Sequence, residues 1–243
     1  MISNSSGVLG IIPARGGSKR LPRKNLLLLA GKPLISFTIQ AGLQSHCIDE
    51  LMVSTDDSEI ARVSIEYGAK VPFMRSSALA QDDTSTFEVV RNVIDYYKNE
   101  KSRLFEFIVL LQPTSPLRDA VEIEDAMLLL RKNNADAVIS VCEPDHTPLW
   151  CNTLPNNLSM EGFLRDDVKF KRSQELDRYY RVNGAVYIIN VSRLLAEQTF
   201  FIKDNIFAHI MPQEKSVDID TGLDLKLCEL LIQERMDTTM VLS

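Results

Sequence analysis

Histidine and cysteine are scarce in the 243-residue sequence, and their spacing excludes several common kinds of site. The three histidines are too scattered for a hydrolase triad or a metal cluster, and no Gly-x-Ser-x-Gly motif is present. The four cysteines form no Cys-x-x-Cys pair, so we interpret them as reduced thiols rather than zinc ligands. These absences argue against a serine hydrolase and against a structural zinc protein.

Long apolar runs are also absent, because no segment approaches the roughly 20 apolar residues that span a bilayer. The first six residues lack the charged and apolar regions of a signal peptide. We therefore expect a cytoplasmic protein without a membrane partner. The net charge of −6 argues against a general nucleic-acid binder, because the basic residues gather in one loop rather than over a face.

That basic loop follows Val8–Ile12, an apolar run that predicts a buried strand. It places Gly16, Gly17 and Ser18 among five cations, namely Arg15, Lys19, Arg20, Arg23 and Lys24. Glycines let a backbone approach a ligand closely, and the cations favour a multiply charged anion. The spacing fits neither a P-loop nor a dinucleotide fingerprint. A solvated loop is the plainer interpretation, but open α/β sheets bind ligands at this position, so we predict a triphosphate cradle.

The rest of the chain alternates between strand and helix patterns. We predict strands at 51–55, 70–74, 107–111, 137–141, 185–189 and 207–211, and helices at 34–43, 59–67, 119–131, 192–197 and 223–235, with a further helix capped by Thr84 or Ser85 and ending at Tyr97. This order predicts an α/β fold with a doubly wound, mostly parallel sheet. Residues 1–142 and 183–243 form one nucleotide-binding domain in this interpretation.

Residues 143–182 break the alternation, because prolines, an Asn-Asn pair and a short basic stretch interrupt the pattern. We interpret this segment as a small protruding subdomain of short strands that serves in dimerisation. It is called the excursion below.

The second chemical motif is Asp218-Ile219-Asp220. A strand period of two turns both carboxylates to one face, and Mg²⁺ prefers one or two carboxylates together with phosphate oxygens. The following Asp-Thr-Gly is also a good helix start, with Asp220 or Thr221 as the cap. Because a triphosphate cradle occurs in the same chain, we favour metal binding, and the implied chemistry is nucleotidyl transfer.

Several segments together resemble one known family. They are Ile12–Asn25, Val53–Asp56, Leu111–Arg118, Arg181–Tyr187 and Asp218–Thr221, in order over nearly the whole chain. They resemble the N-acylneuraminate cytidylyltransferases, or CMP-sialic acid synthetases. The resemblance implies a Rossmann-like nucleotidyltransferase that joins CTP to a nine-carbon 2-keto sugar acid, gives the CMP-sugar and releases pyrophosphate.

The resemblance also implies roles for particular residues. The phosphate contacts would be Arg15, Gly16, Gly17, Ser18, Lys24 and Asn25, and the cytidine contacts Arg75, Thr84, Ser85 and Thr86. The sugar contacts would be Gln112, Arg178, Arg181, Asn183, Tyr187, Phe200 and Phe201. Asp218 and Asp220 would hold Mg²⁺, with Arg15, Lys24 and Asp220 as the catalytic residues. Whether Asp220 or a metal-bound hydroxide takes the proton stays open. The excursion matches a subdomain that reaches across a homodimer to the partner's active site.

Two departures from the family pattern lie on the sugar side. Trp150 stands where one branch has a lysine, and an arginine–glutamine pair is shifted to Arg172-Ser173-Gln174. Neuraminate, legionaminate and pseudaminate therefore all stay open as substrates. Two alternatives also stay open, namely a CTP-binding regulatory or scaffold protein without turnover and a cytidylyltransferase for the eight-carbon acid Kdo.

Overall fold

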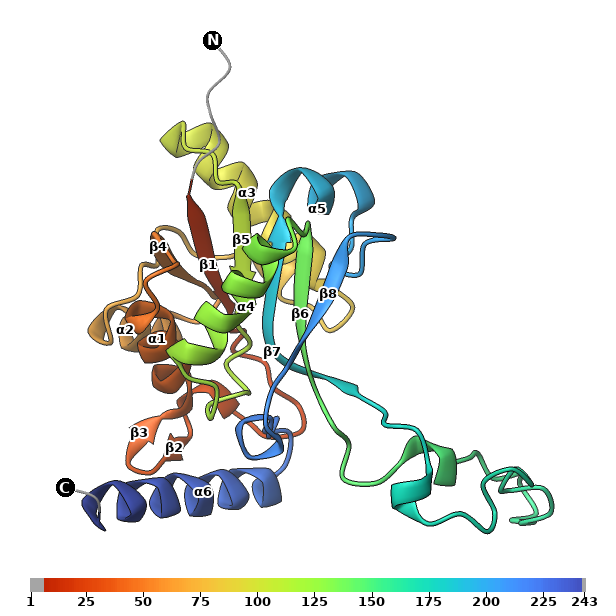
Figure 1. Cartoon of the computed structure of the whole chain (residues 1–243). Helices are drawn as coiled ribbons and strands as arrows, with labels where there is room; N and C mark the ends of the chain where they lie inside the picture. Colours follow the sequence, from red (N-terminus) through yellow and green to blue (C-terminus); the bar gives the residue numbers. More distant parts are fainter. Residues whose placement is uncertain (1–6, 242–243) are drawn as a thin grey trace.

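The fold is built on a six-stranded sheet in the order β4-β1-β5-β7-β6-β8 (Figure 1). The computed structural model describes residues 7–241. The strands are β1 (Val8–Pro13), β4 (Glu50–Ser54), β5 (Phe107–Leu110), β6 (Ala137–Cys142), β7 (Arg181–Asn190) and β8 (Ile206–Ile210). Within this sheet, β7 runs antiparallel to its neighbours β5 and β6, and the other paired strands are parallel. The predicted α/β class with a mostly parallel sheet is confirmed.

Helices cover both faces of this sheet. The helices α1 (Leu34–Gln44), α2 (Ser58–Glu66) and α4 (Ala120–Lys132) pack on one face, and α3 (Thr86–Lys101) and α5 (Val191–Glu197) pack on the other. Alternate β1 residues divide between the two cores, since Val8 and Ile12 join the first and Leu9 and Ile11 the second. The sheet is therefore doubly wound, as predicted.

Side chains cap two helix starts, and the cap at Ser85 is one of the two predicted for that helix. The Asp57 carboxylate accepts hydrogen bonds from the backbone N–H groups of Glu59 and Ile60 at the start of α2. Ser85 and Glu88 form a reciprocal capping box at the start of α3. The helix α6 (Gly222–Val241) extends beyond its predicted end and covers a small third core with β2 (Leu28–Leu29). The paired strand β3 (Lys32–Pro33) completes that hairpin.

The predicted strand at 70–74 is wrong. Only Lys70 makes a single bridge, to Met52, and the chain then leaves the sheet. Pro72 explains the difference, because proline has no N–H group to donate to a ladder.

The excursion extends away from the sheet in Figure 1. Its described residues before β7 form short 3₁₀ turns at Pro148–Trp150 and Ser173–Glu175, so the predicted short strands are wrong. Phe170 is 89% exposed and Leu158 is 71% exposed, so these large apolar side chains do not form a core. An isolated hairpin needs a packed face to be stable, and among these residues only Val168 is buried. No described helix of the protein is long and apolar enough to cross a membrane.

Candidate active site

The candidate site lies where the strand order reverses direction. From β1 the chain passes through α1 to β4, which lies on one side of β1. From β4 it continues through α3, on the opposite face of the sheet, to β5, which lies on the other side of β1. Such a reversal opens a crevice at the carboxyl ends of the strands. The basic loop follows β1, and Gln112–Thr114 follow β5, so both segments meet at this crevice.

A pocket of about 350 Å³ occupies this crevice. Eight of the residues predicted to bind nucleotide or sugar line it, namely Arg15, Ser18, Lys24, Asn25, Arg75, Thr84, Thr86 and Gln112. A larger hollow of about 860 Å³ lies around Gly7, Cys47 and Arg131, at the amino ends of the strands, and carries none of the predicted residues. Ligands of parallel sheets bind at the carboxyl ends, so the smaller pocket is the candidate site.

The glycine loop is held close to the end of β4. The Gly16 N–H group donates to the Asp56 carboxylate at 3.1 Å, and a Cβ at Gly16 would lie 2.8 Å from a carboxylate oxygen of Asp57. Gly17 has open space around it, so packing does not demand a glycine there. The buried Asn25 side chain donates to the Arg15 carbonyl at 3.0 Å and joins the two ends of the loop.

Carboxylates on two sides of the pocket hold four of the loop's five cations. On one side Asp82 pairs with Arg15 at 2.9 Å and with Lys19. On the other side Asp220 pairs with Arg20 at 2.7 Å and with Lys24 at 3.0 Å. The four cations therefore gather around two carboxylates, Asp82 and Asp220.

Arg23, the fifth cation, points elsewhere. Its guanidinium pairs with Asp57 and Glu59 at the start of α2.

Arg75 supplies a different kind of donor. Its side chain is 3% exposed, and its Nη2 lies 3.5 Å from the Asp56 carboxylate. Burial lowers the pKa of this guanidinium. Its Nε and Nη2 make no hydrogen bond within the described part of the chain. A buried guanidinium with unused donors on a pocket wall is suited to bind a ligand oxygen.

The two aspartates of the Asp218-Ile219-Asp220 motif flank a buried isoleucine. Ile219 is fully buried, and its N–H group donates to the Thr114 carbonyl at 2.8 Å, directly after β5. One oxygen of Asp218 is buried without a hydrogen-bond partner among the described residues. Burial raises the pKa of Asp218, and the charge of Asp220 raises it further. The hydrogen bond from Lys24 lowers the pKa of Asp220.

Of the two predicted caps of the last helix, Asp220 or Thr221, the structure places Thr221 at the start of α6. Thr221 and Asp224 exchange hydrogen bonds at the start of α6, with the Thr221 N–H group donating to Asp224 at 2.7 Å. The Asp220 side chain instead faces the basic loop. Residues 7–235 contain no cluster of three or more His, Cys, Asp or Glu suited to a metal. A hard cation at this pair would have to complete its shell with phosphate oxygens and water.

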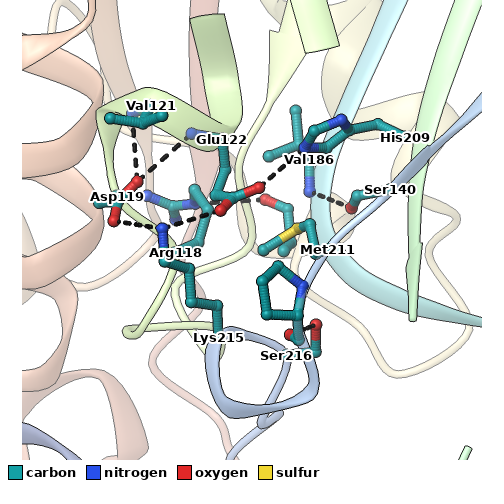
Figure 2. Close-up of polar contacts among 12 residues, drawn as sticks. Arg118, Asp119, Val121, Glu122, Ser140, Val186, His209, Met211, Lys215 and Ser216 are labelled. Atoms are coloured by element: carbon teal, nitrogen blue, oxygen red, sulfur yellow. Dashed lines mark hydrogen bonds and ion pairs between the residues drawn. The ribbon is translucent and has the colours of Figure 1, made fainter. Parts of the chain in front are cut away.

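Buried polar contacts fix the segment that leads into these aspartates. Asn183 donates to the Ser216 hydroxyl at 2.9 Å and accepts from the Ser140 hydroxyl at 2.6 Å. Figure 2 shows that Lys215 lies against Asp119 and Glu122 at the start of α4. Asn183, predicted to contact sugar, is 2% exposed and uses its side chain inside the protein. The structure therefore assigns it a positioning contact with this segment.

The remaining sugar-side predictions fall into two groups. Tyr187 makes edge-to-face contacts with Phe200 and Phe201, with ring centroids 5.7 and 6.4 Å apart. Gln112 lies against Gly184, where a Cβ would meet its Oε1 at 2.8 Å and where φ is +76°. This close approach and the left-handed backbone both demand glycine.

The two predicted arginines of the excursion end lie farther out. The Arg178 side chain is 80% exposed, and it lies 3.9 Å from Glu143. Arg181 donates to the Ser216 carbonyl at 3.4 Å. Neither residue lines the pocket, so the structure does not bring them to the nucleotide residues.

Ser85 also lies outside the pocket lining, because its hydroxyl is used in the cap of α3. Asp82 also lines the pocket, although none of the sequence motifs indicates it. The acidic pair Asp82-Asp83 directly before a predicted helix was the available signal.

Comparison with known proteins agrees with this geometry. The family model "Cytidylyltransferase" matches residues 9–217. A CMP-N,N′-diacetyllegionaminic acid synthase of Legionella pneumophila is 39% identical over 93% of this chain and 96% of that protein. An N-acylneuraminate cytidylyltransferase of Escherichia coli O18:K1:H7 is 34% identical over 94% of this chain and 52% of that protein.

A solved structure also resembles the fold. CMP:2-keto-3-deoxy-manno-octonic acid synthetase complexed with CTP gives a TM-score of 0.67 at 22% identity, over 95% of this chain and 100% of that one. This likeness supports the doubly wound nucleotidyltransferase fold. The family model and the similar sequences agree with the fold and with the basic loop at the crevice. This chain therefore belongs to the cytidylyltransferase family.

Proposed function

We propose that this protein is a cytidylyltransferase that activates a nine-carbon 2-keto sugar acid with CTP and releases pyrophosphate. The observation that carries the proposal is the convergence of Arg15, Lys24, Arg75 and Gln112 on one pocket at the carboxyl ends of β1 and β5. Membership of the family, with relatives named for legionaminate and neuraminate chemistry, supports the nonulosonate class. A nucleotide substrate is consistent with a cytoplasmic enzyme.

The chain's own residues act mainly by positioning and by neutralising charge. Arg15 and Lys24 hold phosphate oxygens, so that the anomeric hydroxyl of the sugar acid can attack the α-phosphorus in line with the leaving pyrophosphate. Arg75, with two unused donors, binds on the cytidine side together with Thr84 and Thr86. Gln112 and the ring of Tyr187 orient the sugar.

Asp218 and Asp220 are the proposed Mg²⁺ ligands. The buried, unpartnered oxygen of Asp218 and the adjacent carboxylate of Asp220 fit a hard cation with few protein ligands. Bound Mg²⁺ would neutralise phosphate charge. In the structure described, the charge of Asp220 is instead neutralised by Lys24 and Arg20, which donate to its two oxygens.

The sugar side is proposed to be completed by a homodimer. The excursion exposes the apolar side chains of Leu154, Leu158, Met160 and Phe170, which its own chain does not cover. It also carries Arg178, whose guanidinium is suited to pair with the carboxylate of a sugar acid. Contact with a second copy would bury the apolar groups and bring this arginine to the partner's pocket.

The test is pyrophosphate release from CTP and Mg²⁺ in the presence of N-acetylneuraminate, legionaminate, pseudaminate or Kdo, each supplied separately. Release with one nine-carbon acid supports the proposal and names the substrate. Release with Kdo alone would replace it with the eight-carbon activity. CTP binding without release in any of the four reactions would favour a regulatory protein.

A further inference from the structure

Asp82 occupies the place where an anion would contact the basic loop. It lies between the 3₁₀ turn Ser77–Leu79 and α3, and it lines the nucleotide pocket. One of its oxygens is 2.9 Å from the Arg15 guanidinium, and the other pairs with Lys19. Arg15 is held further by the Gln81 carbonyl, which accepts from Nη1 at 3.1 Å. The Asp82 carboxylate is therefore already paired with two cations, Arg15 and Lys19, that would otherwise bind phosphate.

Asp82 differs from Asp220, the other carboxylate on the cradle. Asp220 has Asp218 close enough for its charge to raise the pKa of that carboxyl, and the two are the proposed Mg²⁺ ligands. Among the ion pairs of the described residues, Asp82 alone holds Arg15 and Lys19, and its neighbour Asp83 pairs with neither. A phosphate group at Arg15 or Lys19 needs the same donors, so it has to displace the Asp82 carboxylate. The hydrogen bond from Lys19 lowers the pKa of Asp82 and keeps it ionised to compete.

We propose that Asp82 is a competing carboxylate that holds Arg15 and Lys19 between turnovers, weakens binding of CTP and pyrophosphate, and speeds pyrophosphate release. The inference rests on the proposed function, which makes these two the anions of the site. Both ion pairs are partly exposed, with side-chain exposures of 36% for Arg15, 79% for Lys19 and 47% for Asp82. Exposed pairs are weak, so a polyphosphate can displace the carboxylate and the carboxylate can return.

The test compares Asp82→Asn with Asp83→Asn, a neighbouring change that removes the same charge without removing an observed ion pair. Titration calorimetry of inorganic pyrophosphate, CTP and cytidine gives the affinities at fixed ionic strength. We expect Asp82→Asn to bind pyrophosphate and CTP about three- to tenfold more tightly than the wild type. Asp83→Asn should stay within about twofold, and cytidine, which has no phosphate, should bind both variants alike.

Product inhibition gives a second measurement. The inhibition constant of pyrophosphate in Asp82→Asn should fall by the same factor as its dissociation constant, with a Tm close to that of the wild type. Equal affinities in the two variants, with CTP still bound by the wild type, would overturn this inference and leave the proposed function standing. Weaker binding in Asp82→Asn would also overturn it, because Asp82 would then orient Arg15. A wild type that binds neither CTP nor pyrophosphate would overturn both.

Discussion

The nucleotide pocket and the excursion are built in opposite ways. On the pocket side, Arg15 and Gln112 follow buried strands, and the Arg75 side chain is 3% exposed. The excursion has almost no buried side chain apart from Val168, and Phe170 is 89% exposed. The pocket is therefore organised by the core of one chain, whereas the excursion has no comparable core.

Under the proposed function, this difference separates nucleotide binding from sugar selectivity. The pocket residues proposed to meet the nucleotide are placed by the sheet. Arg178 and Trp150, on the proposed sugar side, lie in the excursion, which we propose packs against a second copy. We expect changes in the pocket to affect catalysis strongly and changes in the excursion to affect assembly and sugar use.

Arg15→Gln should give the largest effect on the pocket side. We expect turnover to fall about 100-fold or more, because one donor to transition-state charge contributes a few kcal/mol. The measurement is pyrophosphate release at saturating CTP and sugar acid. Arg23→Gln is the matched control, since Arg23 pairs with Asp57 and Glu59 and should keep near-normal turnover. Similar activity of the two variants would contradict the assignment of Arg15.

The pocket side could be predicted from the sequence in large part, because its signals are local. The apolar run of β1 and the cations that follow it stand next to each other in the chain. The direction of β7 could not be predicted so simply, since it depends on how the excursion returns the chain to the sheet. The contact of Asp82 with Arg15 joins distant segments, and only the folded loop brings them together.

Asn183 was predicted as a sugar contact from its motif, and burial could not be deduced from that pattern. Asn183→Ala tests the positioning contact and should give the next largest effect. The change removes the Asn183 contacts of the Ser140 and Ser216 hydroxyls, which keep only their bonds to the Val186 N–H group and the Pro212 carbonyl. We expect the free energy of unfolding to fall by about 1–3 kcal/mol. The Mg²⁺ concentration for half-maximal activity should rise about threefold in protein that is still folded.

Chemical denaturation and Mg²⁺ titration measure these two effects. Asn152→Ala is the control, because Asn152 lies in the excursion and donates to the Phe163 carbonyl. An unchanged Mg²⁺ requirement in Asn183→Ala would limit the network to a role in stability.

Phe170→Ser sharpens the comparison from the excursion side. We expect the dimer to dissociate about tenfold more readily, because a phenylalanine that is exposed in one chain would be buried between two. Sedimentation equilibrium measures the change, and CTP affinity should stay the same. Leu128→Ser on α4 removes another exposed apolar side chain, 65% exposed, and should leave the dimer intact. A monomeric wild type would contradict the proposed role of the excursion.

The smallest expected effect is on the pocket side, in the stability of the protein at acidic pH. The hydrogen bond from His209 lowers the pKa of Glu122, burial opposes it, and Lys215 lowers it further (Figure 2). A carboxyl with a lowered pKa in the folded state stabilises the protein above its unfolded pKa of about 4.3, and this stabilisation is lost as the pH falls through the folded value. Glu122→Gln should therefore reduce the slope of unfolding free energy against pH in this acidic range, by at most about one proton. Glu66→Gln, an exposed change on α2, should leave the slope as in the wild type. Lys215 pairs with Glu122 and holds the segment before Asp218, so protonation of Glu122 in acid should loosen this part of the pocket. An unchanged slope in Glu122→Gln would show that other groups control the acid dependence of stability.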